Sequence, residues 1–224
     1  MENPWTQLPQ KPPFILSCDA DEIEHFNTRQ HDIKFKVILN EIPSPYIGNL
    51  ESPVIFLNLN PAYSPEESES SQVAQYRKIA QMNLLHQFAD YPFYVLDPSL
   101  KGTPSGYEWF NSRFSPLMHA TGMSAKELSN KLFLVEFFPY RSQKCNWRGN
   151  ILPSQRYALS LLEKAISRQA TVIIMRSEKF WIDAVPALKT YPYCYKLHSC
   201  QQVYISEKNL GTKEFNAVVE KICR

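Results

Sequence analysis

The chain has 224 residues, of which 44% are hydrophobic and 21% are charged, and its formal net charge is +2. This balance excludes an intrinsically disordered chain, and the small net charge restricts any nucleic-acid site to a local patch of the surface. No apolar run approaches the roughly 18 residues of a membrane-spanning helix, and the first residues lack the pattern of a signal peptide. We therefore expect a cytoplasmic protein without a membrane partner.

An N-terminal arm over residues 1–17 contains four Pro residues. Because Pro stiffens the chain and cannot continue a helix, we expect the arm to be extended. Its apolar residues Trp5, Phe14 and Ile15 are expected to pack it onto the body of the protein.

Beyond the arm, apolar runs predict strands, and apolar residues spaced three and four apart predict helices. In chain order the predicted elements are helix 19–29, strand 53–58, helix 72–88, helix 105–121, a short helix from Ser124, strand 132–138, helix 154–167, strand 170–175, helix 177–184, strand 193–197 and helix 212–222. Segment 35–39 fits a strand or a helix, 42–48 is interpreted as a Pro-rich loop, and 92–96 is a short apolar and aromatic run.

Strands that alternate with helices are typical of a parallel sheet with helices on both faces. The sequence therefore predicts one three-layer α/β/α domain over residues 1–224, with a central, mainly parallel sheet of about four strands. In such sheets, ligands bind beyond the carboxyl ends of the strands. The segments that follow strands are thus the places for a functional site, and they are 58–64, 136–142 and 198–204.

Common signatures of cofactor and metal sites are missing from the sequence. It has no G-x-G-x-x-G, G-x-x-x-x-G-K-[ST], G-x-S-x-G or H-E-x-x-H pattern. Its five Cys residues form no C-x-x-C pair, which argues against a zinc ribbon or an iron–sulfur cluster. We expect neither a metal nor a cofactor.

Two segments that follow strands carry a family resemblance. The first is Asn-Leu-Asn-Pro-Ala-Tyr-Ser at 58–64, and the second is His-Ser-Cys-Gln-Gln-Val-Tyr at 198–204. With the lead-in Pro-Tyr-Ile-Gly at 45–48, they resemble the uracil-DNA glycosylase superfamily, and the order of elements fits from about residue 42 to the C-terminus. The first motif is fairly specific, whereas the second departs from the family pattern at Cys200 and Gln201 and lacks the expected Pro.

The resemblance implies an enzyme that flips a base out of the DNA stack and hydrolyses its N-glycosidic bond. It implies that Asn60 positions the attacking water. It also implies that His198 hydrogen-bonds the base as charge develops on it. Family members read the base with a polar residue at the end of the strand that matches 132–135, where uracil enzymes have Asn.

The residue at this reading position is Glu136. An ionised carboxylate only accepts hydrogen bonds, so it would repel O4 of uracil but accept from N4 of cytosine. Burial at a strand end would raise its pKa, and a protonated Glu136 could also donate to N3 of cytosine. The alternative is a buried carboxylate paired with an arginine such as Arg141 or Arg113.

Other residues of the expected base site follow from the same resemblance. Ala62 matches a position where uracil-specific members have a Tyr that blocks substituents at C5, so this side is open unless Tyr63 closes part of it. Asn58 belongs to the same base-binding set. Phe93 or Tyr94 is expected to stack on the flipped base, unless both belong only to the core.

The stretch 140–156 holds four basic residues and no acidic one, so it is expected to contact phosphates unless it is only a solvated face. The segment 198–204 would enter the duplex, but it lacks the Leu that family members often insert. The expected DNA-binding residues are Arg141, Lys144, Arg148, Ser199, Gln201 and Gln202.

With the resemblance, an open C5 side and a cytosine reader predict a DNA glycosylase that excises a 5-substituted cytosine. Such bases are characteristic of phage DNA, so phage defence is the expected context. No Lys lies in the two motifs, so the enzyme is expected to be monofunctional unless Lys144 acts as the lysine of a Schiff-base lyase. We expect a monomer. One alternative is a uracil or deaminated-base glycosylase of base-excision repair, in which Glu136 does not read the base. The other is a non-catalytic module of the same fold that binds a nucleotide or a protein partner.

Overall fold

The part of the chain that the computed structural model describes, residues 1–63, 71–147 and 151–224, is organised around a five-stranded sheet. Its strands are β1 (Tyr46–Gly48), β2 (Val54–Asn58), β3 (Leu132–Glu136), β4 (Thr171–Ile174) and β5 (Cys194–Lys196), in the spatial order β1-β3-β2-β4-β5. β1 runs antiparallel to β3, and all other neighbours are parallel. The predicted mainly parallel sheet is confirmed, and the four predicted strands are β2 to β5.

The edge strand β1 lies in the segment interpreted as a Pro-rich loop, and for residues 46–48 that interpretation is wrong. These residues pair with residues 133–135 of β3. Two Pro residues precede the strand, where Pro is tolerated because an edge strand need not donate on its outer side. A strand of three residues is too short to show a periodic pattern, so the pairing depends on the neighbouring strand.

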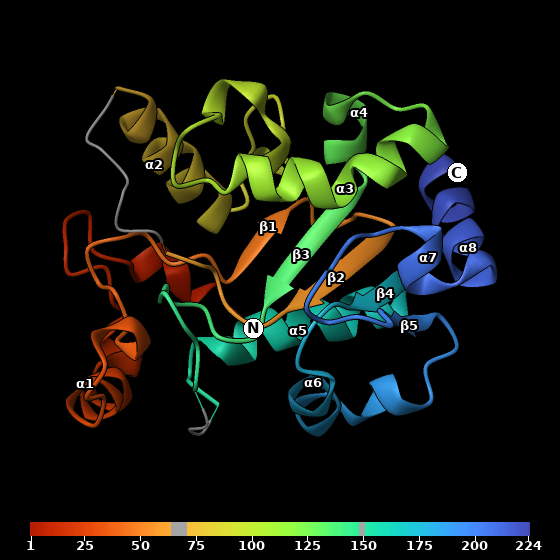
Figure 1. Cartoon of the computed structure of the whole chain (residues 1–224). Coiled ribbons are helices and arrows are strands. Elements are labelled where there is room, and N and C mark those ends of the chain that lie inside the picture. The colour runs from red at the N-terminus through yellow and green to blue at the C-terminus, as the bar shows by residue number, and fades with distance from the viewer. Residues whose placement is uncertain (64–70, 148–150) are drawn as a thin grey trace.

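Helices cover both faces of the sheet (Figure 1). On one face lie α2 (Ser71–Leu84), α3 (Tyr107–Thr121) and α4 (Ala125–Ser129), and on the other lie α5 (Gln155–Ser167) and α6 (Glu178–Ala184). The short α7 (Glu207–Leu210) leads into α8 (Thr212–Cys223), which packs against α3 and β2, whereas α1 (Ala20–Thr28) lies at the opposite side of the molecule. The predicted three-layer α/β/α architecture is therefore confirmed.

The N-terminal arm packs on the body as expected, but it is not extended throughout. Pro4–Gln7 form a short 3-10 helix, since Pro is tolerated at the start of a helix and Asn3 caps it. The Trp5 side chain is 2% exposed, and Phe14 is also buried. The arm is tied down by hydrogen bonds as well, since Asn3 Nδ2 donates to the Leu84 carbonyl and the Phe14 N–H donates to the Leu39 carbonyl, both at 2.7 Å.

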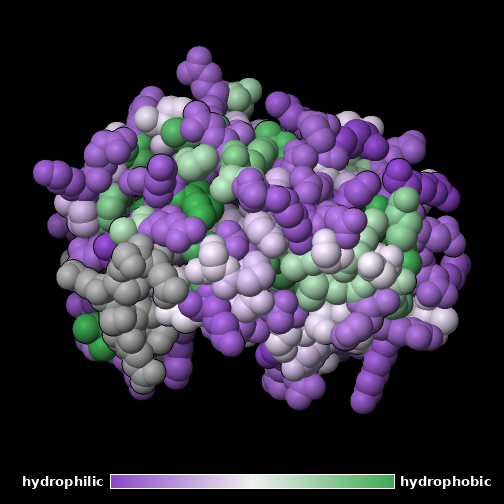
Figure 2. Space-filling view, turned by 90° about the horizontal axis from the view of Figure 1, so that it is seen from above, coloured by the Kyte–Doolittle hydropathy of each residue, from purple (hydrophilic) through white to green (hydrophobic). Residues whose placement is uncertain are grey.

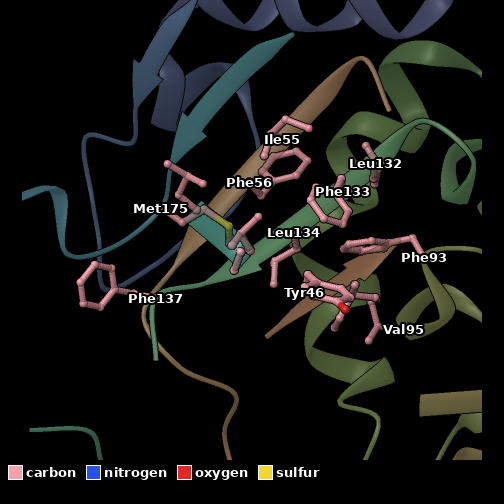
Figure 3. Close-up of a cluster of buried hydrophobic side chains, with 14 of the residues drawn as sticks. Tyr46, Ile55, Phe56, Phe93, Val95, Leu132, Phe133, Leu134, Phe137 and Met175 are labelled. Atoms are coloured by element: carbon pink, nitrogen blue, oxygen red, sulfur yellow. The ribbon is translucent and has the colours of Figure 1, made fainter. Parts of the chain in front are cut away.

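Buried apolar side chains from β2, β3 and the neighbouring segments form one core cluster. Figure 3 shows part of it, with Ile55 and Phe56 of β2 next to Phe133 and Leu134 of β3. Both strands are buried along their whole length, which explains why they are apolar up to their last residues, Asn58 and Glu136. The aromatic run 92–96 enters this core and forms a short 3-10 turn rather than a strand.

The face over α2, α3 and α4 is mainly hydrophilic, with small apolar patches between the polar side chains (Figure 2). Within the described ranges, no helix has both the length and the apolar character needed to cross a membrane.

Candidate functional site

Two polar side chains meet at the carboxyl ends of β2 and β3. The strands pair in register with Asn58 opposite Glu136, the last residue of each. Asn58 Nδ2 donates a hydrogen bond to Glu136 Oε1 at 3.1 Å, and the Trp181 indole N–H donates to the Asn58 carbonyl at 3.0 Å. None of the ion pairs within the described ranges includes Glu136. Glu136 therefore forms no direct ion pair with Arg141 or Arg113, and that alternative is wrong.

Glu136 is 3% exposed, and burial raises its pKa to about 8 because a carboxylate loses its hydration in the interior. The hydrogen bond from Asn58 and the charges of Arg176 and Arg141 act in the opposite direction and only partly offset this effect. At neutral pH the side chain is mostly the neutral acid. Since Oε1 accepts from Asn58, the acid proton is expected on Oε2.

Two buried atoms of this pair, Glu136 Oε2 and Asn58 Oδ1, have no hydrogen-bond partner among the described residues. A buried polar atom without a partner is costly, so it is expected to find one in a ligand or an ordered water. The neutral acid offers a donor and the amide oxygen offers an acceptor. The pair is therefore suited to a ligand edge on which an acceptor lies next to a donor.

A pocket of about 200 Å³ opens at this pair. That volume would hold on the order of seven water molecules and suits a single-ring heterocycle. Its walls come from the loop after β2, from residues 104–106 and the first turn of α3, and from the loops before β1 and after β4. The pocket thus lies where the fold predicts a ligand, beyond the carboxyl ends of the strands.

The loop after β2 is held by the guanidinium of Arg141, which is 7% exposed and lines the pocket. Arg141 donates to the Ala62 carbonyl at 2.7 Å, to the Ile42 carbonyl at 3.1 Å and to the Tyr76 hydroxyl. A buried guanidinium with these partners cannot lie on an exposed phosphate-binding face. The expectation that Arg141 contacts DNA phosphates is therefore wrong. Its side chain instead holds the loop after β2 and shapes the pocket.

Asn60 and Ala62 both line the pocket, as expected for base-site residues. Asn60 Nδ2 donates to the Pro61 carbonyl and to Ser142 Oγ, both at 3.1 Å, so its amide oxygen is the group suited to accept from a water. Ala62 contributes only a methyl group to the wall. Tyr63 does not belong to the lining.

Arg176, Trp109 and Phe110 are among the lining residues that the sequence analysis did not name. Arg176 lies two residues after the end of β4, and its Nε donates to the Cys200 carbonyl at 3.3 Å. Its place after a strand end was a usable signal. Trp109 and Phe110 lie on the first turn of α3, and they supply the aromatic part of the wall. No sequence signal distinguished these two from other aromatic residues, because their position depends on how α3 packs.

His198 is not brought to the pocket. Its side chain is exposed, and its N–H donates to the Asn209 carbonyl at 2.8 Å. Its imidazole lies near the start of α8, where Cε1 would be 3.9 Å from a Cβ added to Gly211. The expected pair of Asn60 and His198 is therefore not assembled around one cavity in this structure.

Phe93 and Tyr94 are both buried in the core and neither lines the pocket. The Phe93 ring packs against Phe110 and Phe114, with centroids 5.8 and 5.5 Å apart, and Figure 3 shows it on the β1 side of Phe133. Phe93 and Tyr94 therefore belong to the core, which was the alternative to stacking on a flipped base.

Most of the remaining expected DNA-binding residues are at the surface. Lys144, Gln201 and Gln202 are exposed, and Ser199 is half-buried, with its N–H donating to Asn209 Oδ1 at 2.8 Å. Arg148 lies outside the described residues. Lys144, Ser199, Gln201 and Gln202 do not line the pocket, so any contact of these four with DNA would be made outside it.

Within residues 1–63, 71–147 and 151–224, no group of three or more His, Cys, Asp or Glu side chains could hold a metal ion. Comparison with models of protein families, with curated proteins and with solved structures found no match. Function must therefore be inferred from the pocket itself.

Proposed function

We propose that this chain is a monofunctional DNA glycosylase that hydrolyses the N-glycosidic bond of a 5-substituted cytosine flipped into the pocket. The observation that carries the proposal is the buried pair of Glu136 and Asn58. It offers one donor and one acceptor in a pocket the size of a single-ring base. Defence against phage DNA with hypermodified cytosines is the biological role that suits this substrate.

Cytosine complements the pair through N3 and N4. N3 accepts from the Glu136 Oε2 hydroxyl, and the N4 amino group donates to Asn58 Oδ1. In this arrangement Glu136 faces N3, which must gain a proton for cytosine to leave as a neutral base. Glu136 then both reads the base and acts as the general acid.

Uracil is the alternative substrate, because a neutral Glu136 removes the repulsion that an ionised carboxylate would exert on O4. The acid would donate to O4, and the N3–H of uracil would donate to Asn58 Oδ1. Two features favour the modified cytosine: the small Ala62 side chain leaves room at the pocket wall, and the acid is matched to N3.

The chemical step would use two further lining residues. Asn60 Oδ1 orients the attacking water toward C1′ of the sugar. Arg176 stabilises the partial negative charge that develops on the base as the N-glycosidic bond breaks, before Glu136 has fully transferred its proton to N3. This is the role expected of His198 from the sequence. A positioned donor of this kind typically contributes on the order of 10²–10³ to the rate.

A non-catalytic module that binds a nucleotide is the second candidate. The observation that favours it is the exposed position of His198 outside the pocket. Such a module would use the same donor and acceptor to hold a base without cleaving its bond to the sugar.

The decisive experiment incubates the protein with DNA from phages that carry hypermodified cytosines and with uracil-containing DNA, and identifies released bases by mass spectrometry. The wild type is expected to release the modified cytosine. Glu136→Gln resembles the neutral acid and keeps a donor, so it should bind the base but lose on the order of 10²–10⁴ in single-turnover rate, because it cannot transfer a proton. Glu136→Leu should lose both properties.

Each other outcome assigns the site differently. Release of uracil without modified cytosine would support the uracil alternative. Binding of modified DNA by the wild type without any release would support the nucleotide-binding module.

A further inference from the structure

An arginine lies against two aromatic rings beside the pocket. The Arg113 guanidinium carbon is 5.3 Å from the centroid of the Trp109 ring and 4.4 Å from that of the Tyr204 ring. Arg113 Nη1 also donates to the Tyr204 hydroxyl at 3.3 Å. We refer to Trp109, Arg113 and Tyr204 as the Tyr204 stack.

The Tyr204 stack is continuous with the pocket and reaches solvent. Trp109 lines the pocket at one end, and Tyr204 is 37% exposed at the other. The Arg176 guanidinium lies 5.9 Å from the same Trp109 ring and adds a second cation where stack and pocket meet. Exposed aromatic rings combined with guanidinium groups are the side chains that bind unpaired bases and the phosphates between them.

The loop that carries Tyr204 is fixed by the side chain of Asn209. Asn209 Nδ2 donates to the carbonyls of Gln202 and Tyr204, at 2.8 and 3.1 Å, and Asn209 Oδ1 accepts from the Ser199 N–H. The following Ile205 N–H donates to the Arg113 carbonyl at 3.0 Å. The ring of Tyr204 is thus presented by a preorganised backbone, which reduces the ordering cost of binding.

The tip of this loop has no large apolar side chain. Residues 199–202 are Ser, Cys, Gln and Gln. Proteins that distort a duplex frequently insert an apolar wedge between base steps, and flipping is least costly for a base that is already unpaired. A loop without a wedge is suited to a strand that is single from the start.

We propose that the Tyr204 stack binds nucleotides that flank the base in the pocket, and that the substrate is therefore single-stranded DNA. This inference rests on the proposed function, since it takes the pocket to hold one base of the same strand. A flanking base stacks on the exposed ring of Tyr204. Arg113 lies near the phosphate between that flanking base and the flipped nucleotide, while Arg176 faces the base in the pocket.

The test is fluorescence anisotropy with a labelled, mixed-sequence single strand of normal DNA bases and with the same sequence as a duplex. The wild type should bind the single strand more tightly. Tyr204→Ala should weaken that binding by about 5- to 150-fold, the range that corresponds to loss of one base–aromatic stack. Tyr204→Phe should retain it, since the ring is kept. Tyr193→Ala is the matched control, because Tyr193 is 42% exposed and lies outside the stack.

The inference is overturned if Tyr204→Ala, with unchanged thermal unfolding, binds the single strand as the wild type does. It is also overturned if the duplex, or RNA of the same sequence, is bound more tightly. Base release from duplex alone would leave the proposed function standing and remove this inference. Single-strand binding that depends on Tyr204, without release of any base, would support the stack and contradict the proposed function.

Discussion

Asn58 and Glu136 are 78 residues apart in the chain and are joined by a hydrogen bond of 3.1 Å across the ends of β2 and β3. The bond forms because two parallel strands in register end side by side. It is buried because helices cover both faces of the sheet. The result is a carboxyl group that is mostly neutral at pH 7, next to an amide oxygen that has no partner among the described residues.

The rate of base release and the free energy of unfolding should both fall as the pH rises toward alkaline values. Base release should decline as the pH passes about 8, since the neutral acid is the form that donates to the base. The folded-state pKa of Glu136 lies above its ordinary value of 4.5, so the unfolded chain releases this proton first. This contribution to the free energy of unfolding is fully present below about pH 4.5 and is lost as the pH rises to about 8.

Glu136→Gln should remove both pH dependences, because an amide does not titrate. Single-turnover release and denaturant unfolding, each measured across this pH range for both proteins, test the prediction. Superimposable pH profiles of the wild type and the variant would show that Glu136 does not titrate as the structure indicates.

Arg176→Ala and His198→Ala should differ in their effect on catalysis. Loss of Arg176 removes a charge from the pocket wall and should lower the single-turnover rate by about 10²–10³. His198→Ala should leave that rate nearly unchanged, since the imidazole is exposed and outside the pocket. The reverse order of effects would restore the role that the sequence assigned to His198.

Arg141→Ala and Lys144→Ala should separate stability from DNA affinity. Removing the Arg141 guanidinium leaves the carbonyls of Ile42 and Ala62 without this donor, so the free energy of unfolding should fall by about 3 kcal/mol. Lys144 is exposed, and its loss should spare stability but lower the salt slope of single-strand affinity by about 0.7 if it contacts a phosphate. Denaturant unfolding and salt titrations measure the two effects, and an unchanged slope would exclude Lys144 from the DNA path.

Gly48→Ala should be markedly more destabilising than Gly122→Ala. Both glycines have positive φ, +106° and +68°, so Ala costs about 1–2 kcal/mol at either position. At Gly48, an added Cβ would also lie 2.3 Å from the Leu132 carbonyl oxygen, whereas at Gly122 it meets nothing within 4 Å. Denaturant unfolding of the two variants is the measurement, and equal losses would argue against the close pairing of β1 with β3.

The sequence by itself determined the four strands β2 to β5 and the strand ends at which the pocket lies. The runs 53–57 and 132–135 are continuously apolar because a parallel strand covered on both faces has no solvent-facing side. Burial at the end of such a run also predicted a raised pKa for Glu136, unless an arginine paired with it. These conclusions need only local pattern and the general properties of parallel sheets.

The tertiary structure decided which side chains meet. It joined Glu136 to Asn58 rather than to an arginine, enclosed Phe93 in the core, and placed Trp109 at the pocket. It also directed His198 away from the pocket, toward the start of α8. The different environments of Phe93 and Trp109 arise from the packing of α3 on the sheet. Contacts between segments far apart in the chain depend on that packing and on the paths of the loops, which no local pattern of residues specifies.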